Sequence, residues 1–184
     1  MSRLYRNCIE IDSSVDLSID GSNCVSISNA KYTWVRNVHS LVELNLRLSE
    51  GKKLLKVSPF NDSKEARKHA GTTYSIIKSA VAGLVNPFVR RLIFEGPGYK
   101  CSVEGQVVSF KLNFSHPLEY TLPSAMDGKN ESPTILALSC FDKEMLGKAC
   151  SEIKALKWPD AYKGQGIRYE NETIVTKTPK KKAK

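Results

Sequence analysis

The sequence lacks the long hydrophobic run that a membrane-spanning helix requires. No apolar stretch approaches the roughly 20 residues needed to cross a bilayer, so we expect no membrane insertion. The segment Met1–Asn7 has two arginines but no apolar core. It resembles neither a secretory signal nor a transit peptide, and we expect either that the protein works in the compartment where it is made or that the chain is already mature.

Cysteine is present, but its arrangement excludes the usual cysteine-based sites. The chain has five cysteines, an odd number, and no two of them have CxxC spacing. Neither a disulfide framework nor a zinc site is therefore predicted, and a reducing compartment fits best. We expect no metal and no other cofactor.

Residues suited to catalysis are few and scattered. The three histidines, His39, His69 and His116, lie far apart in the sequence, and none belongs to a metal-binding or nucleophile motif. His116 precedes Pro117 at a strand end, where a histidine that hydrogen-bonds locally is the simpler interpretation. Gly96-Pro97-Gly98 lacks the other glycines of a phosphate-binding loop. We predict that the chain is not an enzyme, and a hydrolase using His116 is the least favoured hypothesis.

Positive charge is in excess over negative charge. The 184 residues carry a formal net charge of +9, and 41% of them are hydrophobic, which is enough to form folded cores. An excess of this size favours a polyanionic partner, either nucleic acid or an acidic membrane surface.

The hydrophobic pattern changes period twice along the chain. Alternating apolar residues predict strands between Ile9 and Val57, and a helical period follows from Ser63 to Leu84. Asp62 and Glu65 resemble a capping box for this helix. Strand patterns return between Phe88 and Cys140, interrupted by a predicted polar loop at 123–133. A second helix is predicted from Asp142 to Leu156.

The two halves also share a local motif. Leu17-Ser18-Ile19-Asp20-Gly21 in the first half parallels Cys101-Ser102-Val103-Glu104-Gly105 in the second. We therefore predict an α+β protein with two tandem duplicated domains, each a small, mostly antiparallel sheet packed with one helix. The expected division is 1–86, 87–175 and a basic tail at 176–184.

A glycine-broken segment near the C-terminus combines cations with aromatic side chains. Gly164 and Gly166 leave the backbone free to bend, Lys163 and Arg168 supply positive charge, and tyrosines stand at 162 and 169. Bare backbone N–H groups, cations and aromatic faces together suit a phosphate backbone. Residues 157–184 carry eight cations and three acids, which strengthens this interpretation.

Three stretches together resemble a known family. Tyr162–Tyr169, Gly96–Lys100 and Asn113–Pro117 are similar in order and spacing to signatures of the bacterial-type large-subunit ribosomal protein L six family. Two positions depart from its usual pattern: Gln165 stands where the family has lysine, and Ala161 where it has proline.

The resemblance implies two duplicated α+β domains and binding to large-subunit rRNA. The contact is expected mainly through the C-terminal domain, near the sarcin–ricin loop and the translation-factor site, beside neighbouring large-subunit ribosomal proteins. The expected rRNA-binding residues are Tyr162, Lys163, Gly164, Gly166, Arg168, Tyr169, Lys177, Lys180, Lys181, Lys182, His116 and Lys100.

Two questions stay open at this point. A mitochondrial ribosome would account for the divergent middle of the chain and the missing transit peptide, and a bacterial or plastid ribosome is the alternative location. The alternative function is a free-standing module that binds RNA or a membrane surface through its basic tail.

Overall fold

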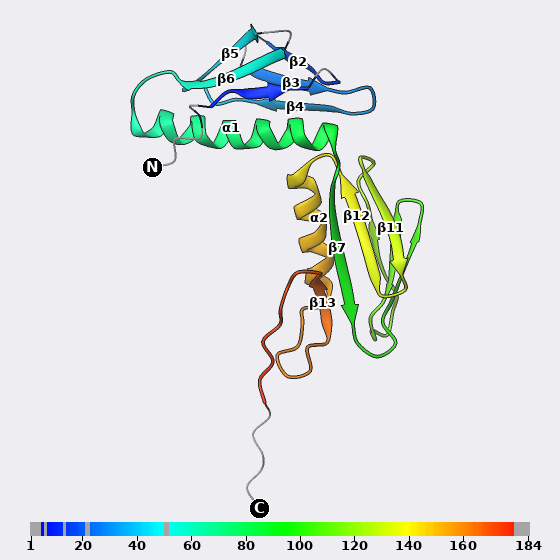
Figure 1. The fold of residues 1–184 in the computed structure, drawn as a ribbon. Coiled ribbons are helices and arrows are strands. Elements are labelled where there is room, and N and C mark those ends of the chain that lie inside the picture. Colours follow the sequence, from blue (N-terminus) through cyan, green and yellow to red (C-terminus); the bar gives the residue numbers. More distant parts are fainter. Residues whose placement is uncertain (1–4, 6, 13, 21–22, 50–51, 179–184) are drawn as a thin grey trace, which may run out of the picture. The chain divides into compact units, whose positions relative to one another are not determined.

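The computed structural model describes residues 5, 7–12, 14–20, 23–49 and 52–178, and it divides the chain into two units, Met1–Pro87 and Phe88–Lys184 (Figure 1). The first unit contains β1 (Ile9–Ile11), β2 (Asp16–Ile19), β3 (Cys24–Ser28), β4 (Thr33–Asn37), β5 (Val42–Ser49), β6 (Lys52–Pro59) and α1 (Lys64–Val85). The second contains β7 (Phe88–Glu95), β8 (Lys100–Glu104), β9 (Val107–Lys111), β10 (Leu118–Thr121), β11 (Met126–Ser132), β12 (Ile135–Cys140), α2 (Lys143–Leu156) and β13 (Gly166–Tyr169).

Each sheet of the first unit has three antiparallel strands. One has the order β1-β6-β5 and the other β2-β3-β4, and α1 packs against β5 and β6. Strand alternation explains which residues form the core. Leu55 and Val57 are two residues apart on β6, so their side chains lie on the same face of the sheet, and both are fully buried. Ile77 on α1 is buried as well, so one face of the helix closes this core.

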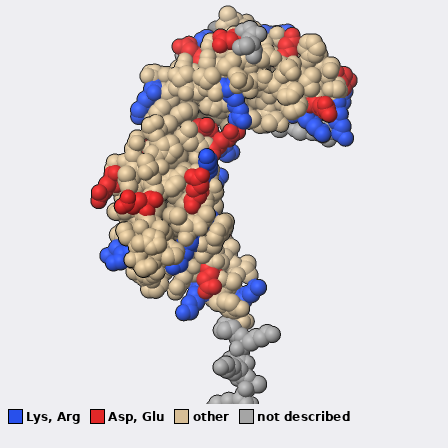
Figure 2. Space-filling model, turned by 180° about the vertical axis from the view of Figure 1, so that it is seen from behind, with Lys and Arg blue, Asp and Glu red and all other residues tan. Residues whose placement is uncertain are grey.

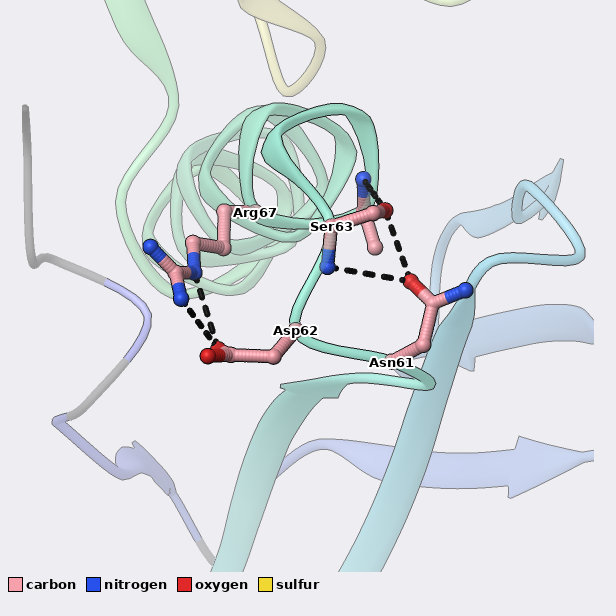
Figure 3. Close-up of polar contacts among 5 residues, drawn as sticks. Asn61, Asp62, Ser63 and Arg67 are labelled. Carbon is pink, nitrogen blue, oxygen red and sulfur yellow. Dashed lines mark hydrogen bonds and ion pairs between the residues drawn. The ribbon is translucent and has the colours of Figure 1, made fainter.

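Helix α1 is capped by a serine. Ser63 stands at the N-cap, and its hydroxyl accepts a hydrogen bond from the Ala66 N–H at 3.1 Å (Figure 3). Asn61 in turn holds Ser63, whose hydroxyl donates to the Asn61 amide oxygen at 2.7 Å. Asp62 pairs with Arg67 instead, so the prediction that Asp62 caps the helix is wrong by one residue.

The second unit has a larger main sheet. Its order is β11-β12-β7-β13, and a separate sheet has the order β10-β9-β8; all pairings are antiparallel. Helix α2 packs on β7 and β12, where Leu92, Leu138 and Ile153 are fully buried. Asp142 caps α2 through a 2.9 Å hydrogen bond from the Glu144 N–H.

The two units repeat one topology. The order β1-β6-β5 with α1 corresponds to β7-β12-β11 with α2, and β2-β3-β4 corresponds to the sheet of β8, β9 and β10. The α+β class with antiparallel sheets is confirmed. The second unit adds one element, β13, which pairs with the outer edge of β7.

Two strands replace much of the predicted connection between β9 and β12. The expectation of a polar loop at 123–133 is wrong, because β11 spans Met126–Ser132 and pairs with β12. β11 is an edge strand of which only Met126 is buried, so its sequence carries little apolar alternation. β10 likewise buries little of its length and was not predicted.

Candidate nucleic-acid interface

The segment between α2 and β13 is a turn closed by Asp160. The backbone carbonyl of Asp160 accepts the Gly164 N–H at 2.9 Å, and its carboxylate accepts the Lys163 N–H at 3.0 Å. The Asp160 N–H donates to the Gln165 carbonyl at 2.9 Å. The expectation of bare backbone N–H groups is therefore wrong at Lys163 and Gly164, and a ligand would meet side chains there.

The two glycines of this turn are required by its geometry. Gly164 has a φ of +69°, in the left-handed region that other residues adopt at a cost. A Cβ on Gly166 would lie 2.6 Å from the Cα of Pro159, closer than any real contact. Gly166 therefore lets the start of β13 pack on the Trp158-Pro159 backbone.

Lys157 joins the turn to two other segments of the second unit. Its ammonium donates to the Leu112 carbonyl at 2.8 Å and lies over the rings of Tyr99 and Phe114, 5.0 and 4.7 Å from their centroids. Asn113 adds a link, because its side-chain amide donates to the Pro97 carbonyl at 3.1 Å. Three segments, 96–100, 111–117 and 157–166, thus meet at one end of the unit.

This end of the second unit, which we name the loop end, presents aromatic and cationic side chains to solvent. Trp158, Tyr162 and Phe114 are 64%, 60% and 45% exposed, a high value for such large side chains. In Figure 2, blue Lys and Arg side chains gather around a red patch where the second unit leads into the tail. The exposed cationic, aromatic and histidine side chains of the loop end are those of Lys100, Lys111, Phe114, His116, Trp158, Tyr162 and Lys163.

A groove of about 510 Å³ crosses part of the loop end. Its lining includes Lys100, Lys111, Phe114 and His116. Lys100 and Lys111 are direct cross-strand partners on β8 and β9. Like charges in that arrangement repel, and an anion between them would remove the repulsion. The structure therefore brings two predicted residues, Lys100 and His116, together with two that sequence reasoning did not select.

The predicted residues of β13 have structural partners within the chain. The Arg168 guanidinium donates to the Glu95 carboxylate at 2.7 Å and is only 25% exposed. The Tyr169 N–H donates to Glu172 at 3.2 Å, and its ring lies beside the Lys154 ammonium, 4.9 Å from the centroid. Arg168 and Tyr169 thus hold β13 in place and present little free surface.

Lys154 and Glu172 form an ion pair behind β13, in which Lys154 is buried and Glu172 is half-buried. Both carboxylate oxygens of Glu172 accept hydrogen bonds from the Lys154 ammonium at 2.6 Å, and Lys154 is 8% exposed. The bond from Lys154 is the main reason that the pKa of Glu172 lies below its usual value, despite partial burial. The pair fastens the segment after β13 to α2.

Of the predicted tail residues, the structure describes only Lys177. The Lys177 N–H donates to the Ala161 carbonyl at 2.8 Å, while its side chain is exposed. The start of the tail therefore lies against the turn. Lys180, Lys181 and Lys182 lie outside the described residues.

Sequence reasoning did not select Phe114, Lys111 or Trp158 as contacts, and it counted Lys157 only among the eight cations of 157–184. In the sequence, the apolar residues at 108, 110, 112 and 114 alternate with polar ones, which predicts that Phe114 points inward, but β9 ends at Lys111. Asn113 then adopts a φ of 55°, which turns the chain and exposes Phe114. Trp158 and Pro159 lie just beyond the predicted end of the second helix at Leu156, and the pair was interpreted as the helix end.

The described part of the chain gives no support for a metal site, for a reactive thiol at Cys101 or Cys150, or for a membrane-spanning helix. No three His, Cys, Asp or Glu residues gather there in a way that could hold a metal ion. Burial raises the pKa of the Cys101 and Cys150 thiols to about 11, so neither is a reactive thiolate near neutral pH. No described helix is both long and apolar enough to cross a membrane.

Comparison with known proteins gives a consistent set of relatives. The chain is 36% identical over 182 residues to the large ribosomal subunit protein uL6 of Acinetobacter baumannii, covering 99% of this chain and 100% of that protein. The uL6 proteins of Pseudomonas entomophila and a Psychrobacter species are 35% and 36% identical over the same length and coverage. No family model matches the chain.

Proposed function

Because the chain belongs to the family of large ribosomal subunit protein uL6, we propose that it binds large-subunit rRNA through the loop end of its second unit. Full-length similarity supports a structural protein of the large subunit and not an enzyme. It also favours this function over the alternative of a free-standing RNA-binding or membrane-surface module.

The observation that carries the proposal is the convergence of three segments on one aromatic and cationic surface. Exposed rings such as Trp158 and Tyr162 offer stacking faces, and unpaired RNA bases bind such faces in a sequence-tolerant way. Lys163 and Lys100 are exposed and can reach phosphates. The segments meet through Lys157, so the surface is fixed before RNA binds.

The residues of this region have two roles in the proposal. Tyr162 and Lys163 touch RNA through their side chains, together with Lys100 and His116. Gly164, Gly166, Arg168 and Tyr169 act by holding the turn and β13 in position. Lys177 and the lysines at 180–182 add charge from the tail.

The position in the ribosome follows from the resemblance described above. We place the loop end at rRNA near the sarcin–ricin loop, where translation factors bind, with other large-subunit proteins as neighbours. The relatives that were compared come from bacteria, which favours the bacterial location over the plastid alternative. Their names give no support to the expected mitochondrial location.

Binding to large-subunit rRNA by single-residue variants tests the proposal. We expect Tyr162→Ala to weaken binding about tenfold, because stacking of a base on an aromatic ring is worth about 1–3 kcal/mol. Lys163→Ala should also weaken binding, since a phosphate contact is lost. Neither variant should change thermal stability, because both side chains are exposed.

Lys148→Ala is the matched control. Lys148 is also an exposed lysine of the second unit, but it lies on α2 beside Asp142 and Glu144. We expect its replacement to leave rRNA affinity unchanged. Equal losses for Lys148→Ala and Lys163→Ala would mean that net charge, and not the loop end, determines binding.

A further inference from the structure

Strand β5 is an open edge of the first unit. It is eight residues long and lies at the end of the order β1-β6-β5 (Figure 1), and among the strands that the structure describes it pairs with β6 alone. An open edge of this length presents unpaired backbone groups to any second strand. It contains neither proline nor a bulge, two of the devices that block such pairing.

The backbone groups that face outward can be assigned. The Phe60 N–H donates to the Leu41 carbonyl at 2.9 Å, just beyond the pairing of β5 with β6. Hydrogen bonds alternate along an antiparallel strand, so odd-numbered residues of β5 bond to β6. The outward N–H and C=O groups therefore belong to Leu44, Leu46 and Leu48.

Val42 does not offer its groups for further pairing. Its N–H donates to the His39 carbonyl at 3.0 Å, and its carbonyl accepts from the Asn23 side chain at 3.4 Å. The available edge of β5 is thus limited to the stretch after Val42.

The side chains of β5 form a self-complementary pattern. Glu43 and Arg47 stand two residues on either side of Asn45, and both are exposed. Within the part of the chain that the structure describes, neither Glu43 nor Arg47 forms an ion pair. Leu46 and Leu48 are 44% and 77% exposed, so apolar side chains on the other face are also left in water.

The corresponding strand of the second unit is protected. β11 occupies the same place in the repeated topology, but its pairing with β12 shifts between Asn130 and Ser132, which indicates a bulge. Its exposed positions include Asp127, Lys129 and Glu131 and no large apolar side chain. The open, leucine-bearing edge is therefore specific to the first unit.

We propose that two copies of this chain pair through antiparallel β5 strands related by a two-fold axis at Asn45. Glu43 then lies opposite the partner's Arg47, and Arg47 lies opposite the partner's Glu43. Leu44 lies opposite the partner's Leu46, and these are the residues whose N–H and C=O groups face outward, so the backbone hydrogen bonds match. The two three-stranded sheets become one six-stranded sheet. This inference is independent of the proposed RNA binding.

Charge reversal tests the pairing in the free, full-length chain. Sedimentation velocity over a range of concentrations should show reversible dimers of the wild-type protein. Glu43→Lys and Arg47→Glu should each weaken dimerisation at least tenfold, because each places two like-charged pairs across the axis. The variant that carries both changes should dimerise like the wild type.

Mixing the two single variants gives the sharpest outcome. Lys at 43 of one chain then faces Glu at 47 of the other, and Arg47 faces Glu43, so heterodimers should form where neither variant dimerises alone. At concentrations low enough for every form to be monomeric, all three variants should unfold at the wild-type temperature, because the changed side chains are exposed. A wild-type chain that is monomeric at every concentration, or single variants that dimerise as well as the wild type, would overturn the proposal.

Discussion

Gly166 shows how closely the turn before β13 depends on one residue. Its missing side chain leaves room for Pro159, whose Cα would lie 2.6 Å from an added Cβ. Its φ of +157° adds conformational strain for any other residue. Since the close neighbour is backbone, it cannot move aside as a flexible side chain could.

We therefore expect Gly166→Ala to destabilise the protein by about 2 kcal/mol or more, measured by denaturant unfolding. Gly147→Ala is the control, because Gly147 lies within α2 and has no atom within 4 Å of an added Cβ. That change should stabilise the protein by about 0.5–1 kcal/mol, as glycine weakens helix interiors. Equal effects at the two positions would contradict the packing argument.

The Lys154–Glu172 pair makes stability depend on pH. The pKa of Glu172 is lowered from its usual value of 4.5, chiefly by the hydrogen bond from Lys154. A carboxyl group with a lowered pKa in the folded state stabilises that state above its unfolded pKa, and the stabilisation is lost as pH falls through the folded pKa.

Glu172→Gln should thus lower the melting temperature at neutral pH and reduce the further loss below about pH 4.5. Glu119→Gln, at an exposed carboxylate on β10, is the control and should leave the pH profile unchanged. Parallel pH profiles for the wild type and Glu172→Gln would show that the pair has no such role.

At the scale of elements, Asp62 and Ser63 at the start of α1 should contribute differently to stability, because Ser63 alone caps the helix. Ser63→Ala should cost about 1 kcal/mol of unfolding free energy, because the Ala66 N–H loses its acceptor. Asp62→Ala should cost less, because Asp62 contributes an exposed ion pair to Arg67. Chemical denaturation of both variants measures the difference, and a larger loss for Asp62→Ala would assign the cap to Asp62.

Sequence patterns predicted the elements whose residues alternate between core and solvent. Val25 and Ile27 are fully buried on β3, and the pattern of the second helix placed its start at Asp142, which the structure confirms. β11 was missed because it lies at an edge and buries only Met126. β13 was interpreted as loop because Gly164 precedes it and Gly166 is its first residue, so two glycines dominate its local signal.

The candidate site was only partly predictable for a related reason. Motif resemblance selected Tyr162 and Lys163, which are exposed, but also Arg168, which pairs with Glu95 across the strands. The sequence around Arg168 does not indicate that Arg168 pairs with Glu95, because the two residues are 73 positions apart. Phe114 became exposed through the positive φ of Asn113, which alternation does not encode.

At the scale of the whole molecule, the two units have separate cores and one of them carries the loop end. We expect a fragment comprising Phe88–Lys184 to fold and to keep most of the rRNA affinity, measured by filter binding. Met1–Pro87 should bind rRNA weakly. Comparable affinity of the two fragments would place the RNA contact elsewhere.

Salt dependence measures how many cations meet phosphates in the complete chain. Lys163→Ala should reduce the slope of log affinity against log salt by about 0.7 to 0.9, the contribution of one phosphate contact. Lys148→Ala should leave the slope unchanged, because Lys148 lies beside acidic residues on α2. An unchanged slope for Lys163→Ala would remove Lys163 from the contact.

RNA crosslinking with peptide mapping on native large subunits tests the central claim most directly. The account predicts crosslinks between large-subunit rRNA and the segments 111–117 and 158–163, including Phe114, Trp158 and Tyr162. Crosslinks confined to the first unit, or a loop end that reaches no rRNA in intact particles, would contradict it.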